Sequence, residues 1–143
     1  LTPFLALIES PSGNTANNNG LKISATANIR AYYELRSVSS KEVFSLKGNK
    51  GLGTDFYTPF QNNFNTGSTT PSSFSSIEIV ASEDNTTVLI TPRTAIIGHA
   101  VNNTFTITLN EGETYSARDI NATGASSLSG SIVSANKPVS VTL

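Results

Sequence analysis

The 143-residue sequence contains no cysteine, no methionine and no tryptophan, and a single histidine. Without cysteine the chain cannot form a disulfide, so its fold depends on a hydrophobic core. One histidine and no cysteine also leave too few nitrogen and sulfur ligands for a zinc site. Because methionine is missing even at position 1, we expect the chain to be a mature or excised piece of a longer protein.

Charged residues are scarce as well, at 13% of the chain, and the formal net charge is -1. Proteins that bind nucleic acid through its phosphates carry a basic excess, so we expect no nucleic-acid partner. The apolar run at residues 4–8 is far shorter than the ~20 residues that cross a bilayer. It also lacks a basic flank, so we expect a buried strand there and neither a transmembrane segment nor a signal peptide.

Serine, threonine and asparagine together make up more than a third of the chain. Their side chains compete for backbone hydrogen bonds in helices, whereas threonine suits strands and asparagine suits turns. A chain of 143 residues with 37% hydrophobic residues can bury one ordinary core. We therefore predict a single domain over residues 1–143.

Turn residues separate short stretches rich in β-branched and aromatic residues, and no window shows a 3.6-residue apolar period. These stretches predict an all-β fold, an antiparallel β-sandwich of about ten short strands. The expected strands are residues 21–26, 29–35, 42–46, 55–58, 76–82, 86–91, 103–109, 113–117, 130–135 and 139–143. The glycines of residues 48–53 lack the spacing of a phosphate-binding loop and are expected to bend the chain between two strands.

Two pairs of these stretches are joined by short polar turns and are predicted to form hairpins. The first pair is 76–82 with 86–91, and the second is 103–109 with 113–117. In the first pair, Ile77, Ile79 and Ala81 share one face, and Val88 and Ile90 match them on the return strand. Because Val80 and Leu89 make the opposite face apolar too, we expect this hairpin to be the central pair of the sandwich, covered on both faces.

Residues 20–31 and 130–141 read alike, as glycine, strand, a short polar corner and a second strand. One interpretation is an internal pseudo-repeat whose copies bracket the domain and pair in the core. The other is a chance likeness between two strand–corner–strand segments. The sequence leaves both open.

The low-complexity stretch at residues 58–74 is long for an irregular loop, which favours a functional role. Aromatic rings among amides and hydroxyls are typical of adaptable contact surfaces. The predicted ligand-contact residues are Phe60, Gln61, Asn62, Asn63 and Phe64. The alternative is that these rings fold back onto the core, and we expect this of Phe74.

The residues that carry out catalysis are nearly absent. His99 has no acid or nucleophile at a recognisable spacing, so we predict a structural role for it, no catalytic residues and no enzyme activity. Asp84 and Asp119 are weak candidates for a calcium site, but neither lies in a calcium-loop spacing, so we expect no metal and no cofactor. Asn85, Asn102 and Asn121 begin Asn-x-Thr sequons and are possible glycosylation sites.

Several blocks of the chain resemble one family. Residues 79–92, IVASEDNTTVLITP, resemble the "IVATEDNTTVTITP" motif of the IgGFc-binding protein N-terminal domain family. Four further blocks of the chain resemble family motifs and occur in the family's order, two before and two after residues 79–92. They are AYYEL at 31–35, GLGTDFY at 51–57, FTITLNEGETY at 105–115, and LSGS at 128–131 with Ser134 and KPV at 137–139. The resemblance covers about residues 20–141. It departs from the family at Ala27 and Asn28, where a Lys-Pro is usual.

The resemblance implies an extracellular, non-catalytic module. Animal members belong to large secreted proteins, one of them named for binding antibody Fc, and bacterial members to long cell-surface or secreted proteins. The absence of cysteine fits the bacterial branch better. We therefore expect a cell-adhesion or binding module of a bacterial surface protein, with a protein or glycan ligand.

The alternative is a structural building block of an extracellular fibre, filament or sheath, in which neighbouring copies associate through strand edges. The resemblance supplies no residue-level ligand site, so Fc binding is not transferred to this chain.

Overall fold

The computed structural model describes residues 13–36, 41–59, 72, 74–122 and 126–143. Apart from one 3-10 turn, the regular secondary structure of these residues is β, which confirms the predicted all-β class. None of their helices is long and apolar enough to span a membrane. The elements are β1 (Ala16–Asn17), β2 (Ala31–Arg36), β3 (Lys41–Leu46), the 3-10 turn η2 (Gly48–Gly51), β4 (Gly53–Tyr57), β5 (Ser76–Ala81), β6 (Thr86–Thr91), β7 (Phe105–Leu109), β8 (Thr114–Arg118) and β9 (Ile132–Thr142). As predicted, the glycine-rich segment bends the chain between two strands, β3 and β4.

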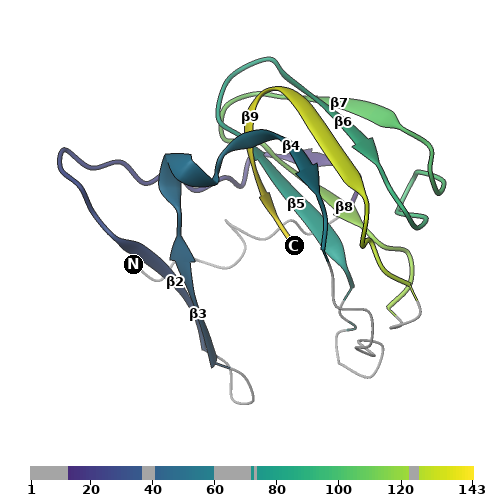
Figure 1. Cartoon of the computed structure of the whole chain (residues 1–143), viewed down its shortest axis with the longest axis horizontal. Helices are drawn as coiled ribbons and strands as arrows, with labels where there is room; N and C mark the ends of the chain where they lie inside the picture. Colours follow the sequence, from purple (N-terminus) through teal and green to yellow (C-terminus); the bar gives the residue numbers. More distant parts are fainter. Residues whose placement is uncertain (1–12, 37–40, 60–71, 73, 123–125) are drawn as a thin grey trace.

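Seven strands form one folded antiparallel sheet in the order β1-β8-β5-β9-β6-β7, with β4 paired to β9 as well (Figure 1). The long strand β9 connects the two parts of this sheet. Its residues 132–135 pair with β6, and its residues 139–142 pair with β5. The change of partner falls at residues 136–138, where Pro138 has no N–H to donate to a strand ladder.

Both predicted hairpins are wrong in their pairing. β5 pairs with β8 and β9, whereas β6 pairs with β7 and β9, so the turn at 82–85 joins strands that are not neighbours. The turn at 110–113 likewise joins β7, which pairs with β6, to β8, which pairs with β5 and β1. Each turn is therefore an arch that carries the chain from one part of the sheet to the other. The central position predicted for β5 and β6 is correct, because each has a strand on both sides.

The predicted inner face is confirmed. Ile77, Ile79 and Ala81 from β5 and Val88 and Ile90 from β6 are all at most 2% exposed. They form one cluster with Ile96, Leu109, Tyr115, Ala117, Leu128, Val133 and Val139. The expectation that the other face is covered fails for β6, because Leu89 is 43% exposed there. The outer surface of this part of the sheet thus faces solvent.

The pseudo-repeat does not correspond to a shared structure. Residues 130–141 lie largely in the continuous strand β9, which replaces two separate predicted strands. Residues 20–30 contain no strand, so the strand predicted at 21–26 is wrong. Strand β9 pairs with β4, β5 and β6, and not with residues 20–31. The two segments are therefore similar in sequence, including their Ser-Ala corners, but they do not share a fold.

Candidate functional site

The two arches lie side by side and bond to each other. The Asp84 carboxylate accepts a hydrogen bond from the Glu111 backbone N–H at 3.0 Å, and the Asn110 side-chain oxygen accepts one from the Asn85 N–H at 3.2 Å. Below them, the backbone of Ala81 exchanges hydrogen bonds with residues 112 and 113. Asn85 and Gly112 both adopt positive φ, a conformation that asparagine and glycine tolerate best. The sequence of each turn thus fits the conformation that the arch requires.

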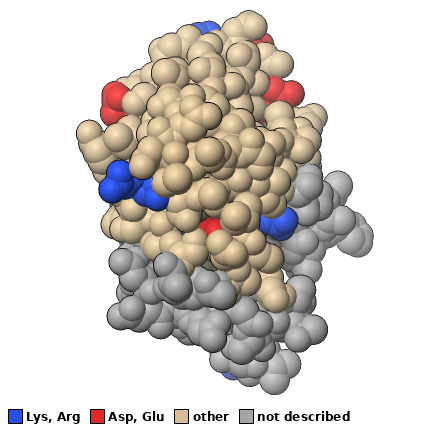
Figure 2. All heavy atoms as spheres, turned by 90° about the vertical axis from the view of Figure 1, so that its right-hand side faces the viewer, with Lys and Arg blue, Asp and Glu red and all other residues tan. Residues whose placement is uncertain are grey.

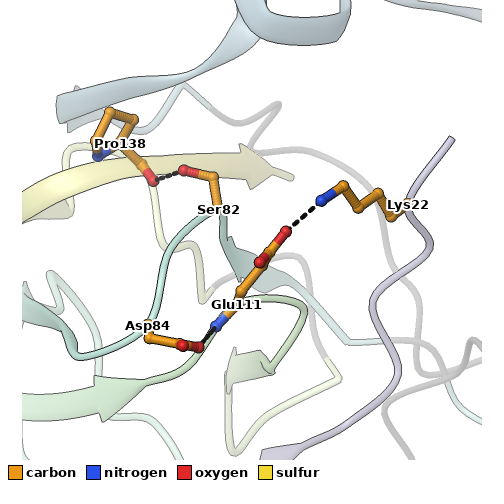
Figure 3. Close-up of polar contacts among 5 residues, drawn as sticks. All are labelled: Lys22, Ser82, Asp84, Glu111 and Pro138. Atoms are coloured by element: carbon orange, nitrogen blue, oxygen red, sulfur yellow. Dashed lines mark hydrogen bonds and ion pairs between the residues drawn. The ribbon is translucent and has the colours of Figure 1, made fainter. Parts of the chain in front are cut away.

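The bend in β9 completes this cluster (Figure 3). The Lys137 ammonium donates to the carbonyl of Asp84 at 2.6 Å, and the Ser82 hydroxyl donates to the carbonyl of Pro138 at 2.6 Å. The Asn136 side chain accepts a hydrogen bond from the backbone N–H of Thr87 at 2.8 Å. We call residues 82–85, 110–113 and 136–138 the arch cluster. It gathers three of the blocks on which the family resemblance rests.

An outer segment of chain also reaches the arch cluster. The Gly20 N–H donates to the carbonyl of Gly112 at 3.0 Å, and Lys22 forms an ion pair with Glu111. The hydrogen bond and the charge of Glu111 raise the pKa of Lys22 above its ordinary value. Both side chains are well exposed, so this pair orients the segment without adding much stability.

The arch cluster is therefore a structural frame. Asp84, a weak calcium candidate, holds the second arch, and Asp119, the other candidate, lies past the far end of β8. Asp119 is fully buried and accepts hydrogen bonds from the Asn121 N–H and the Ser126 hydroxyl, at 2.8 and 2.6 Å. The two carboxylates are not brought together. Across the described ranges, no three His, Cys, Asp or Glu side chains gather where they could hold a metal ion.

His99 takes part in a second polar contact, on the other side of the sheet from solvent-facing Leu89. Its Nε2 lies 2.8 Å from the side-chain oxygen of Asn14, and the Tyr115 hydroxyl donates to the same oxygen at 2.7 Å. An amide oxygen only accepts, so Nε2 carries the proton. The imidazole also stacks on Phe105, with ring centroids 3.4 Å apart. These contacts fasten residue 14 to the sheet.

Burial also changes the titration of Tyr115. The ring belongs to the core and is 2% exposed. Desolvation of its phenolate raises the pKa of Tyr115 to about 12. Since the phenol donates to Asn14, the native structure requires its protonated form.

An exposed apolar surface lies on β2 and β3, which form a separate two-stranded sheet, the arm, that projects from the folded sheet (Figure 1). Register pairs Tyr33 with Phe44 and Ala31 with Leu46, so these four residues share one face. Tyr33, Phe44 and Leu46 are 42%, 49% and 45% exposed. The two rings contact each other with centroids 6.3 Å apart. This is an apolar face that nothing in the described structure covers fully.

The strand-like stretches at residues 29–35 and 42–46 predict both strands of the arm but place them in the sandwich with the other strands. In the structure they form a sheet of their own. Nothing in the local pattern distinguishes a strand that joins a seven-stranded sheet from one that pairs only with its neighbour, since the partner is set by distant residues.

The predicted contact residues Phe60, Gln61, Asn62, Asn63 and Phe64 lie outside the described residues. The positions that flank this segment are well fixed. Thr58 is buried, and its hydroxyl donates to the carbonyl of Leu128 at 2.6 Å. Phe74 is half-buried beneath the guanidinium of Arg118, 4.9 Å from its ring centroid, and is not part of the core cluster.

All three sequon asparagines, Asn85, Asn102 and Asn121, are exposed. Asn85 lies in the first arch, and Asn121 follows Asp119. Asn102 accepts a hydrogen bond from Arg93 at 3.0 Å and adopts positive φ. Their glycosylation remains a prediction.

Comparison with known families gives one match. The family model described as IgGFc binding protein matches residues 42–143, which is more than two thirds of the chain. The match includes the arch cluster and every strand from β4 onward, and it begins inside β3. The resembling block at residues 31–35 lies before it. Comparisons with curated proteins and with solved structures found no match.

Proposed function

Because the chain belongs to the IgGFc-binding protein family, we propose that it is an extracellular binding module whose ligand is a protein. The observation that carries the proposal is the arm, which exposes Tyr33, Phe44 and Leu46 on one face. Contiguous exposed apolar surface of this kind marks interaction sites in soluble proteins. Tyrosine is also among the residues enriched at interface hot spots.

The physical state of the arm supports the same proposal. A two-stranded sheet alone is marginally stable in water, and it gains stability when a third element covers its apolar face. A flat aromatic and aliphatic face suits a protein surface better than a soluble sugar, which needs many fixed hydrogen-bond donors and acceptors. We therefore propose that the ligand protein covers the face formed by Ala31, Tyr33, Phe44 and Leu46.

A finer proposal concerns the setting and a second contact. The lack of cysteine and the family resemblance favour an adhesion module of a bacterial cell-surface or secreted protein. Residues 60–64 are proposed as a further contact, because two aromatic residues stand among amides there, a composition typical of adaptable contact surfaces.

Binding measurements with arm variants test the proposal. Wild-type chain is passed over immobilised IgG Fc, over a mucin glycoprotein and over the glycans released from that mucin. We expect binding to a protein probe, weakened at least ~10-fold in Tyr33→Ser/Phe44→Ser, as for the loss of a hot spot. Leu89→Ser, which removes an equally exposed apolar side chain from β6, is the matched control and should bind like wild type. Binding that the arm variant leaves unchanged, or binding to the free glycans alone, would contradict the proposal.

The same assay separates the second contact from the first. The variant Phe60→Ser/Phe64→Ser, in which the arm is unchanged, should bind more weakly than wild type if residues 60–64 touch the ligand. Full binding by this variant would remove the loop from the proposal and leave the arm.

The alternative role as a fibre building block would use an open strand edge, and among the described residues β7 pairs with β6 on one side alone. A fibre needs two different contact surfaces on every copy, because a contact that pairs a surface with itself closes at two copies. Whether the β7 edge could build a fibre or a closed pair of two copies depends on whether it pairs with a different surface or with β7 of the second copy.

A further inference from the structure

Strand β7 lies at the end of the folded sheet, as Figure 1 shows. Within the described residues β6 is the strand that pairs with it, through Thr86–Leu109, Val88–Ile107 and the pairs between them. No described residue pairs with its other edge, so the backbone N–H and C=O groups there have no ladder partner in the described part of the chain. Such an edge is a template for a further strand.

Strand β7 has none of the charges, prolines or bulges that usually protect an edge. Its residues, FTITL, include no charge and no proline, and its register with β6 runs without a bulge. The other edges in the described part of the sheet are protected: β1 has two residues, and β4 carries Asp55 and a register shift against β9. Proteins normally block exposed edges with short strands, bulges or charges. The unprotected edge therefore stands out within the same molecule.

The face around β7 is also suited to close approach. Figure 2 turns the β6–β7 side toward the viewer and shows a surface with few charged atoms. Thr106 and Thr108 point outward and are exposed, whereas Phe105 and Ile107 pack partly against the core. A strand added beside β7 would cover the remaining exposed parts of these two apolar side chains.

The sequence of β7 is complementary to itself in the antiparallel direction. With Ile107 opposite Ile107 of a second copy, Thr106 lies opposite Thr108 and Phe105 opposite Leu109. Threonine then lies opposite threonine on the outer face, and apolar side chains lie opposite each other on the inner face. Cross-strand pairs of these kinds stabilise sheets. No like charges are opposed. We propose that β7 pairs with β7 of a second copy about a two-fold axis at Ile107, which joins the two sheets into one.

This pairing defines the assembly. A self-complementary contact is used up when two copies meet, so β7 produces a dimer and not a fibre. The dimer leaves the arm uncovered, so dimer formation through β7 is independent of ligand binding through the arm. Dimer formation can be measured in an arm variant, and ligand binding can be measured in a β7 variant.

Charge substitutions at the two outward threonines test the proposal in the full chain. Sedimentation velocity over a concentration series should show a dimer for wild type. Thr106→Lys/Thr108→Lys opposes lysine to lysine twice and should leave only monomer. Thr106→Lys/Thr108→Glu opposes lysine to glutamate twice and should keep the dimer. Thr87→Lys/Leu89→Lys adds the same charge on β6, away from the edge, and should also keep it.

The register has its own test, because the chain contains no cysteine. Under mild oxidation a mixture of Thr106→Cys and Thr108→Cys chains should form a disulfide-linked heterodimer, whereas each variant alone should not, since positions 106 and 106 of the two copies are too far apart for a disulfide. A wild type that stays monomeric at every concentration, a dimer that survives the double-lysine change, or cross-linking of either cysteine variant alone would each overturn the proposal.

Discussion

The carboxylate of Asp84 accepts a hydrogen bond from the backbone N–H of Glu111 at 3.0 Å, across 27 residues of sequence. This contact joins the turn between β5 and β6 to the turn between β7 and β8. Since neither turn closes a hairpin, contacts from outside each turn, of which this is one, hold the arches in place. The blocks that carry the family resemblance therefore mark the frame of the domain, and the exposed arm and the β7 edge are the surfaces on which partners are sought.

Removal of the Asp84 carboxylate should loosen the arch cluster. Asp84→Ala leaves the Glu111 N–H without its acceptor, and we expect a loss of about 1 kcal/mol in the free energy of unfolding. Such a loss lowers the midpoint of thermal unfolding by roughly 3 to 5 °C in a domain of this size. Glu83→Ala removes the neighbouring exposed acid and should change stability by less than about 0.5 kcal/mol. Equal effects of the two changes would contradict this role of Asp84.

Tyr115 should make the protein unstable at high pH. Its pKa is raised from 10.0 to about 12 in the native state, so above pH 10 the unfolded chain loses the phenol proton first. The stability that the buried phenol contributes is complete below pH 10 and is lost as the pH rises to 12, by about 2 kcal/mol. Urea unfolding between pH 9 and 12 measures the slope. In Tyr115→Phe the part of this slope due to Tyr115 should vanish, and an unchanged slope would contradict the assignment.

The sequence predicts the inner face of the sheet well because that face follows from local alternation. Ile77, Ile79, Val88 and Ile90 are all fully buried, and β6 begins and ends where its residues predict. Alternation is a property of one strand, and hydrophobic burial acts on each strand alike. Core residues and many strand positions are therefore readable without any knowledge of partners, although the strand predicted at 21–26 does not form.

The pairing of strands is not readable in the same way. The short turn Glu83-Asp84-Asn85 suits a hairpin, and here it forms an arch because β9, from the end of the chain, lies between β5 and β6. The side-chain contacts that stabilise the arch come from residues 110, 111 and 137, far away in sequence. The exposed face of the arm has the same cause. Among the described residues no further strand pairs with β2 or β3, and Phe44 is 49% exposed.

Asn14 should couple to Tyr115 in a double-mutant cycle. Its side-chain oxygen accepts from both Tyr115 and His99, so Asn14→Ala leaves two donors without a partner and should cost about 1–3 kcal/mol. If the Tyr115–Asn14 bond carries part of this cost, Asn14→Ala should cost less in the Tyr115→Phe background, with a coupling energy of about 1 kcal/mol. Urea unfolding of the four proteins at neutral pH gives this energy. Strict additivity would show that the two side chains act independently.

The two lysines that reach the arch cluster should differ in importance. Lys137 donates to the carbonyl of Asp84 within the bend of β9, whereas Lys22 pairs with Glu111 on the surface, where the two side chains are 74% and 47% exposed. Water and salt replace an exposed ion pair almost fully, so Lys22→Met should leave the unfolding midpoint unchanged. Lys137→Met removes a donor that fixes the backbone of the first arch and should lower the free energy of unfolding by about 0.5–1 kcal/mol. Chemical unfolding at low and at high salt separates the two cases, because the effect of Lys137→Met should persist in salt. A larger loss from Lys22→Met than from Lys137→Met would show that the outer segment, and not the bend of β9, holds the arches together.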